Sequence, residues 1–217
     1  MGSGTNKEGS QMGRTIMVLQ RDRVEDRTWR NIWKNLMPYR IEIFCWQVLH
    51  ERVAVKQELA KKNLIDQEAA VCGLFKNESE LVRHLFFHCL EVWHVWMRWC
   101  SEWGVTWVVL EDLVISFNTW NAGPVRKGEF KIWCMAFYAI LWSVWLYRND
   151  MVFRRATWNA DQVFELVKLK VATWAQAKWP FEYGVVLDTF RYPAEGTMVK
   201  KRKITRIVEE WSKPHKG

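Results

Sequence analysis

With 217 residues, the sequence is long enough to form one domain, or two small ones, around a substantial hydrophobic core. Apolar residues make up 49% of it, which excludes an intrinsically disordered chain, and its 16 tryptophans must fill a core or lie on a surface that awaits a partner. The net charge of +8 suggests nucleic-acid binding, but residues 198–217 carry +5 of it, so no basic groove is evident in the body.

The N-terminal third shows helical periodicity after a leader. We expect residues 1–26 to form a flexible leader. Trp29, Ile32, Trp33 and Leu36 then recur three or four positions apart, which predicts a helix over 29–36 that Pro38 ends. Two further amphipathic stretches predict helices over 41–52 and 55–62.

A long helix is expected in the middle of the chain. Asn77 followed by Glu80 has the pattern of a capping box, in which each side chain binds a free backbone N–H group. The helix that it begins is predicted to run unbroken over 78–103 and to end at Gly104. Four tryptophans of this segment share one face, and core packing is favoured over a ligand site for them: Trp93, Trp96, Trp99 and Trp103.

The C-terminal half contains the clearest loop, at Asn121 to Pro124. A long apolar helix is expected over 128–153 and another over 161–179, after the helix cap Asn159. A weak pattern over Val185 to Tyr192 predicts a short strand.

The segment from Ile132 to Tyr147 raises the question of a membrane, because its sixteen residues carry no formal charge. Lys131 and Arg148 bound it. As a helix it would span roughly 24 Å, which is short of the ~30 Å hydrocarbon core of a bilayer. A buried central helix is therefore favoured over a membrane span.

These patterns predict a mainly α protein, an irregular multi-helix domain with a long apolar central helix and a basic C-terminal tail. We expect four parts along the chain. They are the leader 1–26, a helical Cys/His-containing region 27–122, a helical hairpin 123–180 packed on it, and a C-terminal extension 181–217.

The five cysteines form an odd set, and the first thirty residues mix acids and bases without an apolar run. We therefore expect no secretory signal, and free thiols in an intracellular, reducing compartment. The nucleus and the cytoplasm are the first choices, with an organelle left open.

Cysteine and histidine gather between residues 72 and 94. Cys72, Phe75, His84 and Cys89 form the pattern C-x2-F-x8-H-x4-C. It resembles the C-x2-C-x8-H-x4-C pattern of the zinc-binding region that follows the reverse transcriptase in plant-type LINE retrotransposon polyproteins.

Flanking segments resemble the same family over residues 27 to 179. They are Trp29-Arg-Asn-Ile-Trp33, Pro38, Phe44-Cys-Trp46, Glu78-Ser79, His84-Leu-Phe-Phe-His-Cys89, and Trp142-Ser-Val-Trp-Leu-Tyr-Arg-Asn149 with Phe153. Within a complete retroelement, this resemblance implies a role in holding element RNA or target DNA near the polymerase.

The departure from the family pattern bears on the metal. Phe75 stands where the family has its second cysteine, so Cys72, His84 and Cys89 remain as a vestigial set, with His88 the nearest fourth ligand. In an unbroken helix His84 and Cys89 point about 140° apart, so a joint site needs a bend near His84. Zinc is one alternative. The favoured alternative is a metal-free helix, for which no cofactor is expected. The aromatic side chains that would pack it are Phe75, Phe86 and Phe87.

Motifs of catalysis are missing from the sequence. It contains no Tyr-x-Asp-Asp polymerase motif, no phosphate-binding glycine-rich loop and no G-x-S-x-G elbow. We therefore expect no enzymatic activity.

The leading functional hypothesis is a non-catalytic, retroelement-derived protein-interaction module that acts through host protein or self-association. A co-opted factor and a toxin of genome conflict are forms of it. The candidate partner surface is Trp93, Trp96, Trp142 and Trp145. The first alternative is a nucleic-acid-binding remnant that uses the basic tail and stacked aromatic side chains. The basic run of the tail also resembles a nuclear localisation signal, and it consists of Lys200, Lys201, Arg202 and Lys203. Membrane association through 132–147 is the second alternative.

Overall fold

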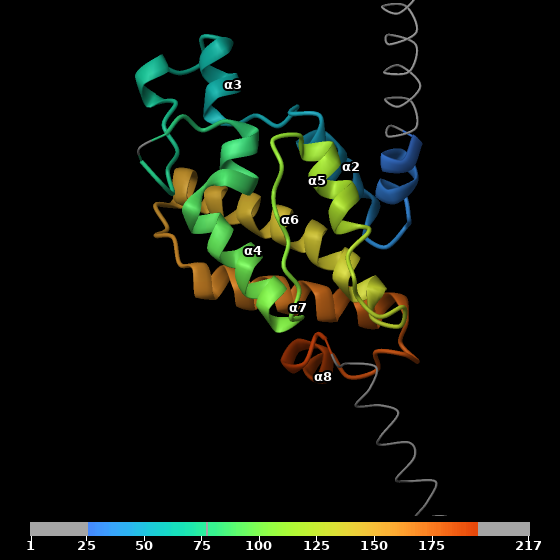
Figure 1. The fold of residues 1–217 in the computed structure, drawn as a ribbon. Coiled ribbons are helices and arrows are strands. Elements are labelled where there is room, and N and C mark those ends of the chain that lie inside the picture. The colour runs from blue at the N-terminus through green and yellow to red at the C-terminus, as the bar shows by residue number, and fades with distance from the viewer. Residues whose placement is uncertain (1–25, 77, 195–217) are drawn as a thin grey trace, which may run out of the picture.

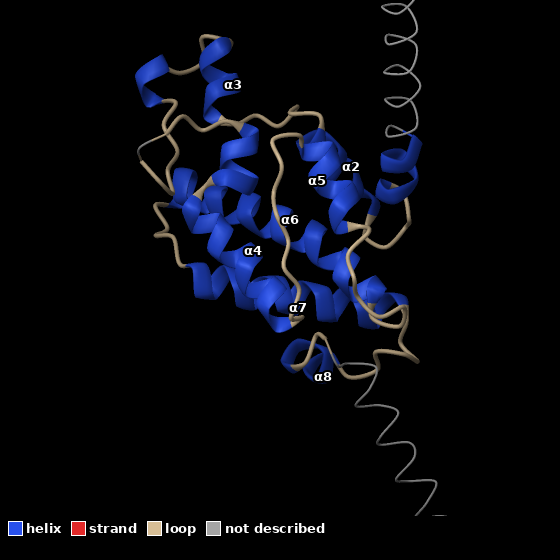
Figure 2. Cartoon of the chain, in the orientation of Figure 1, coloured by secondary structure: helices blue, strands red, loops and turns tan. Residues whose placement is uncertain are grey.

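The computed structural model describes residues 26–76 and 78–194. The predicted leader, the basic run Lys200, Lys201, Arg202 and Lys203, and Asn77 of the predicted capping box lie outside the described residues. Within them the mainly α fold class is confirmed, because more than half are helical and no strand is present (Figure 2).

The described chain begins with a helix over 26–32. The elements that follow are α2 (Tyr39–Leu49), α3 (Lys56–Lys61), the 3-10 helix η1 (Gln67–Ala69), the π-helix η2 (His84–His88), α4 (Leu90–Glu102), α5 (Leu113–Trp120), α6 (Phe130–Arg154), α7 (Ala160–Lys178) and α8 (Val186–Arg191).

The long apolar helix α6 runs through the middle of the molecule, as predicted (Figure 1). Every residue from Ile132 to Leu141 is buried, so this part of the helix is covered by protein on all sides, as its apolar composition requires. Among the described residues α6 is also the one helix long and apolar enough to cross a membrane, and 67% of its most apolar stretch is buried inside the protein. This burial favours the core role.

The helices α6 and α7 form a hairpin, and α8 packs beneath α7 (Figure 1). Arg155 ends α6 in the left-handed conformation, with φ of 57°. Asn159 then caps α7, because its side-chain oxygen accepts a hydrogen bond from the backbone N–H of Gln162 at 3.0 Å. The predicted cap of this helix is therefore confirmed.

Tryptophans build much of the core. Trp120 and Trp133 stack with ring centroids 4.0 Å apart, and each indole N–H donates to the backbone carbonyl of the other residue. Trp96, with no exposed surface, donates its N–H to the carbonyl of Phe86 at 2.8 Å. Their polar atoms are satisfied inside the core, which lets such large side chains be buried without an unpaired donor.

The prediction of one unbroken helix over 78–103 is wrong. The chain forms η2 and then leaves helical geometry at Cys89, where ψ is 124°, before α4 begins. Glu80 lies before these helices rather than in the first turn of one, so it forms no capping box there. The predicted end is confirmed, since Gly104 follows α4 with φ of +59°.

Three shorter segments also differ from expectation. The predicted strand over Val185 to Tyr192 is the helix α8, whose packing against α7 overrides a weak β-pattern. The first described helix ends at residue 32 rather than 36. Helix α5 was not predicted, although Asp112 caps it by accepting a hydrogen bond from the N–H of Ile115.

A buried ion pair joins the middle of the chain to α6. Glu80 is 0% exposed and Arg148 is 5% exposed. Glu80 Oε1 accepts hydrogen bonds from Arg148 Nη2 at 2.6 Å, from Arg148 Nε at 3.1 Å and from the backbone N–H of Lys56 at 2.9 Å. Arg148 therefore pairs inside the protein rather than marking the polar end of the apolar helix.

We expect Glu80→Gln to lower the free energy of unfolding by about 3–5 kcal/mol, because it leaves the buried Arg148 charge uncompensated. Urea unfolding measures this. The double variant Glu80→Gln/Arg148→Met should recover part of the loss. As a control, Glu182→Gln removes one partner of the exposed Lys131–Glu182 pair and should change stability by less than about 1 kcal/mol. Equal losses in both single variants would contradict the assignment.

A substitution at Gly123 tests how tightly the chain packs against the Trp120–Trp133 stack. A Cβ at this position would lie 2.9 Å from Trp133 Nε1 and 3.1 Å from the carbonyl oxygen of Trp120. Gly123→Ala should therefore destabilise the fold by about 1–3 kcal/mol in thermal unfolding. Gly128→Ala, where a Cβ meets nothing within 4 Å, is the matched control and should not destabilise it. A neutral Gly123→Ala would disprove the close packing.

Candidate metal centre

Three predicted ligands come together in one buried group. The donor atoms of Cys72, His84 and Cys89 lie within 4.8 Å of one another, and all three residues are buried. Cys72 comes from the loop after η1, His84 begins η2, and Cys89 joins η2 to α4. The degenerate Cys/His group predicted from the sequence is thus present.

The π-helical turn makes this meeting possible. The backbone N–H of Cys89 donates to the carbonyl of His84 at 2.7 Å, a separation of five residues. An α-helix would direct these two side chains about 140° apart. The wider turn, together with the extended conformation of Cys89, supplies the bend near His84 that the sequence required.

The loop that carries Cys72 is held at both ends. Val71 and Ser79 form an isolated antiparallel bridge, and the N–H of Cys72 donates to the carbonyl of Glu78 at 2.8 Å. Lys56 Nζ donates to the carbonyl of Val71 at 2.9 Å. These bonds place Cys72 independently of any metal.

Hydrogen bonding within the group favours the charged form of one thiol. The bond from the Cys89 thiol, helped by one from His84 and by the backbone N–H groups of Phe75 and Leu74, lowers the pKa of Cys72 to about 4. The same bond raises the pKa of Cys89, which keeps its proton. The bond with Cys72 also raises the pKa of His84. A metal bound here would therefore displace the proton of Cys89.

Glu78 fixes the orientation of the histidine. Its Oε2 lies 2.7 Å from His84 Nδ1, which leaves Nε2 as the ring nitrogen to face a metal. Both ring nitrogens are buried, and neither makes a hydrogen bond of good geometry to another described residue, so Glu78 contacts Nδ1 by proximity and charge. Carboxylates commonly hold metal-binding histidines in this way. Glu78 is recognisable in the sequence only as part of a motif, because its contact with His84 depends on how the loop folds back.

The residues fit three of the four ligands of a structural zinc ion. Phe75 is half-buried and packs against the hydrophobic core, so its position carries an apolar ring instead of a thiolate. His88 is exposed and lies outside the group. If zinc is bound, Cys72, His84 and Cys89 hold it, and it would link the loop to the start of α4.

The four tryptophans proposed as a partner surface lie in or against the core. Trp96 is fully buried, in agreement with the core packing favoured for it, so it could meet a partner only if the fold opened. Trp93, Trp142 and Trp145 are half-buried and pack on the core, with Trp142 edge-on to Phe44 at a centroid distance of 5.1 Å. None of the four therefore presents a free indole face in this fold.

A family model described as zinc-binding in reverse transcriptase matches residues 11–96. The predicted resemblance is thereby confirmed for this part of the chain, which includes the whole Cys/His group. The matched region ends before Trp142, so the likeness of the segment 142–153 stays a prediction. Comparisons with curated proteins and with solved structures gave no match.

We expect the purified protein to carry well under one zinc per chain and to keep its fold in chelator, since Phe75 supplies no ligand. Phe75→Cys should raise zinc uptake toward one per chain in elemental analysis, because it completes the four-ligand set. Leu74→Cys is the control, since it adds the same thiol one position away and should not raise uptake. Stoichiometric zinc in the unchanged protein, with unfolding on chelation, would show that another group completes the site.

Proposed function

We propose that this chain is a non-catalytic, retroelement-derived interaction module that works by binding a host protein. The match to a zinc-binding region of reverse transcriptases supports the origin. The observation that carries the non-catalytic part is the closure of the Cys72–His84–Cys89 group.

That group is the one potential metal cluster among the described residues, and it is shut off from solvent. Catalytic metal sites keep a position open for water or substrate, whereas structural sites are closed. His84 is only 4% exposed, so a substrate cannot reach the donor atoms without opening the fold. The group is therefore suited to holding a loop and a helix together.

Exposed apolar side chains support binding as the activity. Those between residues 166 and 192 come from α7 and from the segment that packs against it: Leu166, Leu169, Phe181, Val185, Leu187 and Tyr192. Phe181 is 97% exposed. Large apolar side chains concentrated on one part of a surface are typical of protein-interaction sites. Sequestration of a host protein through this region would account for a co-opted or a toxic role.

The two alternatives have different support. The basic run of the tail, on which nucleic-acid binding was predicted to depend, lies outside the described residues. Membrane association through 132–147 would require α6 to leave the core in which it is buried.

The proposal is tested by recovery of partners from native extract treated with nuclease. Leu166→Glu/Leu169→Glu should abolish recovery, because two charges replace apolar contacts on the exposed face of α7. Leu64→Glu/Val108→Glu places the same charges on exposed apolar side chains outside residues 166–192 and should leave recovery unchanged. Loss of every partner on nuclease treatment would instead favour the nucleic-acid alternative. Sedimentation of the purified protein distinguishes self-association from a host partner.

A further inference from the structure

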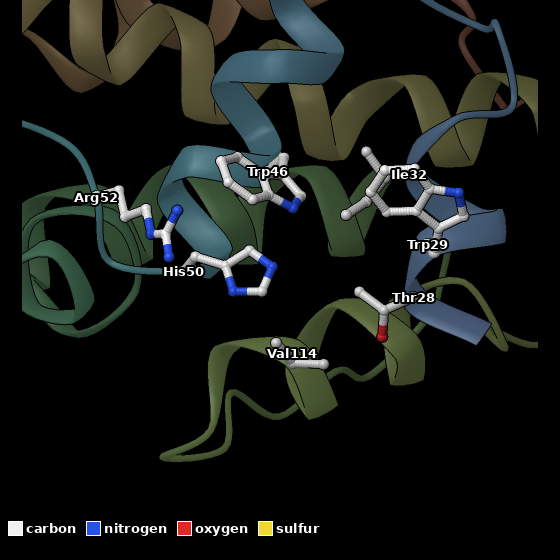
Figure 3. A pocket seen from close by; sticks show the side chains of 7 residues that line it. All are labelled: Thr28, Trp29, Ile32, Trp46, His50, Arg52 and Val114. Atoms are coloured by element: carbon white, nitrogen blue, oxygen red, sulfur yellow. The ribbon is translucent and has the colours of Figure 1, made fainter. Parts of the chain in front are cut away.

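A small open pocket lies between the first described helix, the end of α2 and the start of α5 (Figure 3). Its volume is about 260 Å³, and its walls include six side chains: Trp29, Ile32, Trp46, His50, Arg52 and Val114. Sites for drug-sized ligands have volumes of ~300–1,000 Å³, so this pocket has room for about one ring system and a small substituent.

Two of the walls are indoles. Trp29 is 58% exposed, and its ring lies 5.4 Å from that of Trp33, which supports it from the side. Trp46 is half-buried across the hollow, and Ile32, at 1% exposed, lies between them. Flat aromatic faces held in place suit a planar ring, because they can stack on it without further loss of side-chain freedom.

One side of the pocket is cationic. The guanidinium carbon of Arg52 lies 5.1 Å from the ring centroid of Trp46, and the His50 ring lies 4.8 Å from it. The turn holds Arg52 there, since Glu51 has φ of 53° and the N–H of Arg52 donates to the carbonyl of Gln47 at 2.8 Å. In Figure 3 the side chains of His50 and Arg52 lie across the hollow from Trp29.

The charge of Arg52 indicates which kind of planar ligand the pocket can bind. No carboxylate of the described residues lines the pocket, so a methylated ammonium group, which aromatic cages also bind, would face Arg52 without a counter-charge among them. A planar ring that carries an anion satisfies both the indoles and the guanidinium.

We propose that this pocket binds one nucleotide unit, whose base stacks on Trp29 and Trp46 while its phosphate contacts Arg52 and His50. In a duplex the bases are already stacked and paired, so the unit comes from a single strand or from a free mononucleotide. This site is separate from the exposed side chains of α7, so it stands or falls independently of the host-protein interaction.

The first test uses the full chain and a fluorescent oligoadenylate RNA, with affinity measured by anisotropy. Trp29→Ala should weaken binding about 5- to 100-fold, as expected for loss of one stacked base. Phe153→Ala removes another exposed aromatic side chain that does not line the pocket, and should change affinity less than about twofold. Equal effects of the two variants would overturn the proposal. Melting followed by circular dichroism checks that both variants fold.

The second test separates the phosphate contact from overall charge. Arg52→Ala should reduce the slope of log affinity against log salt by about 0.7, the value for one phosphate contact on a single strand. Arg40→Ala removes the same charge from an exposed position outside the pocket and should leave the slope unchanged. This pair also decides the matter if Trp29→Ala fails to fold. Equal slopes for the two variants would contradict the site.

The source of the nucleotide is distinguished by titration with adenosine monophosphate in a calorimeter. Binding of the oligonucleotide alone identifies a single strand, and binding of both identifies a site that accepts the free unit. A phosphotyrosine peptide is the competitor of closest chemistry. The proposal would be overturned if the peptide bound more tightly than both nucleotide probes and lost affinity in Trp29→Ala. It would also be overturned if neither nucleotide probe bound.

Discussion

The carboxylate of Glu80 and the guanidinium of Arg148 are the interaction on which the arrangement of the remaining parts depends. The same carboxylate oxygen accepts from Arg148 on α6 and from the N–H of Lys56 at the start of α3. Two backbone bonds add to this, from Glu80 N–H to the carbonyl of Ala70 and from Gln57 N–H to the carbonyl of Glu80. Because any other arrangement would leave a buried charge unpaired, the loop that carries Cys72 can take only one position against the central helix.

The tryptophan-rich core provides the surface against which this loop is fixed. Trp96, Trp120 and Trp133 are buried with their N–H groups bonded to backbone carbonyls, whereas the buried N–H groups of Trp99 and Trp103 have no hydrogen-bond partner among the described residues. Phe137 on α6 packs edge-on to Trp120 and close to Trp96. These aromatic rings cover α6, and their contacts explain how so long an apolar helix is kept out of water.

The Cys/His group and the aromatic pocket have different relations to solvent, and this separates their roles. The thiols and the imidazole are enclosed, and backbone hydrogen bonds place the loop of Cys72 without a metal. The group can thus keep its shape although Phe75 replaces one ligand. Trp29 and Arg52, in contrast, lie at an open surface where a ligand can reach them. Binding is therefore expected at the surface, while the enclosed Cys/His group contributes to the fold.

The sequence by itself determined the helical class, the bounds of α6 and α7 within about two residues, the cap at Asn159 and the end of α4 at Gly104. These depend on local periodicity and on single capping residues, which act within a few positions. It also determined the likeness to a zinc-binding region and the three residues Cys72, His84 and Cys89, since their spacing is written in the chain. Only the tertiary structure decided that a π-turn brings His84 and Cys89 together. It alone showed that Glu80 pairs with Arg148, which lies 68 positions away, and that Trp29, Trp46 and Arg52 enclose one pocket. Such contacts join segments that are distant in the chain. Helix propensity and periodicity describe only neighbouring residues, so they do not predict which distant groups will pair with a buried charge or line the same pocket.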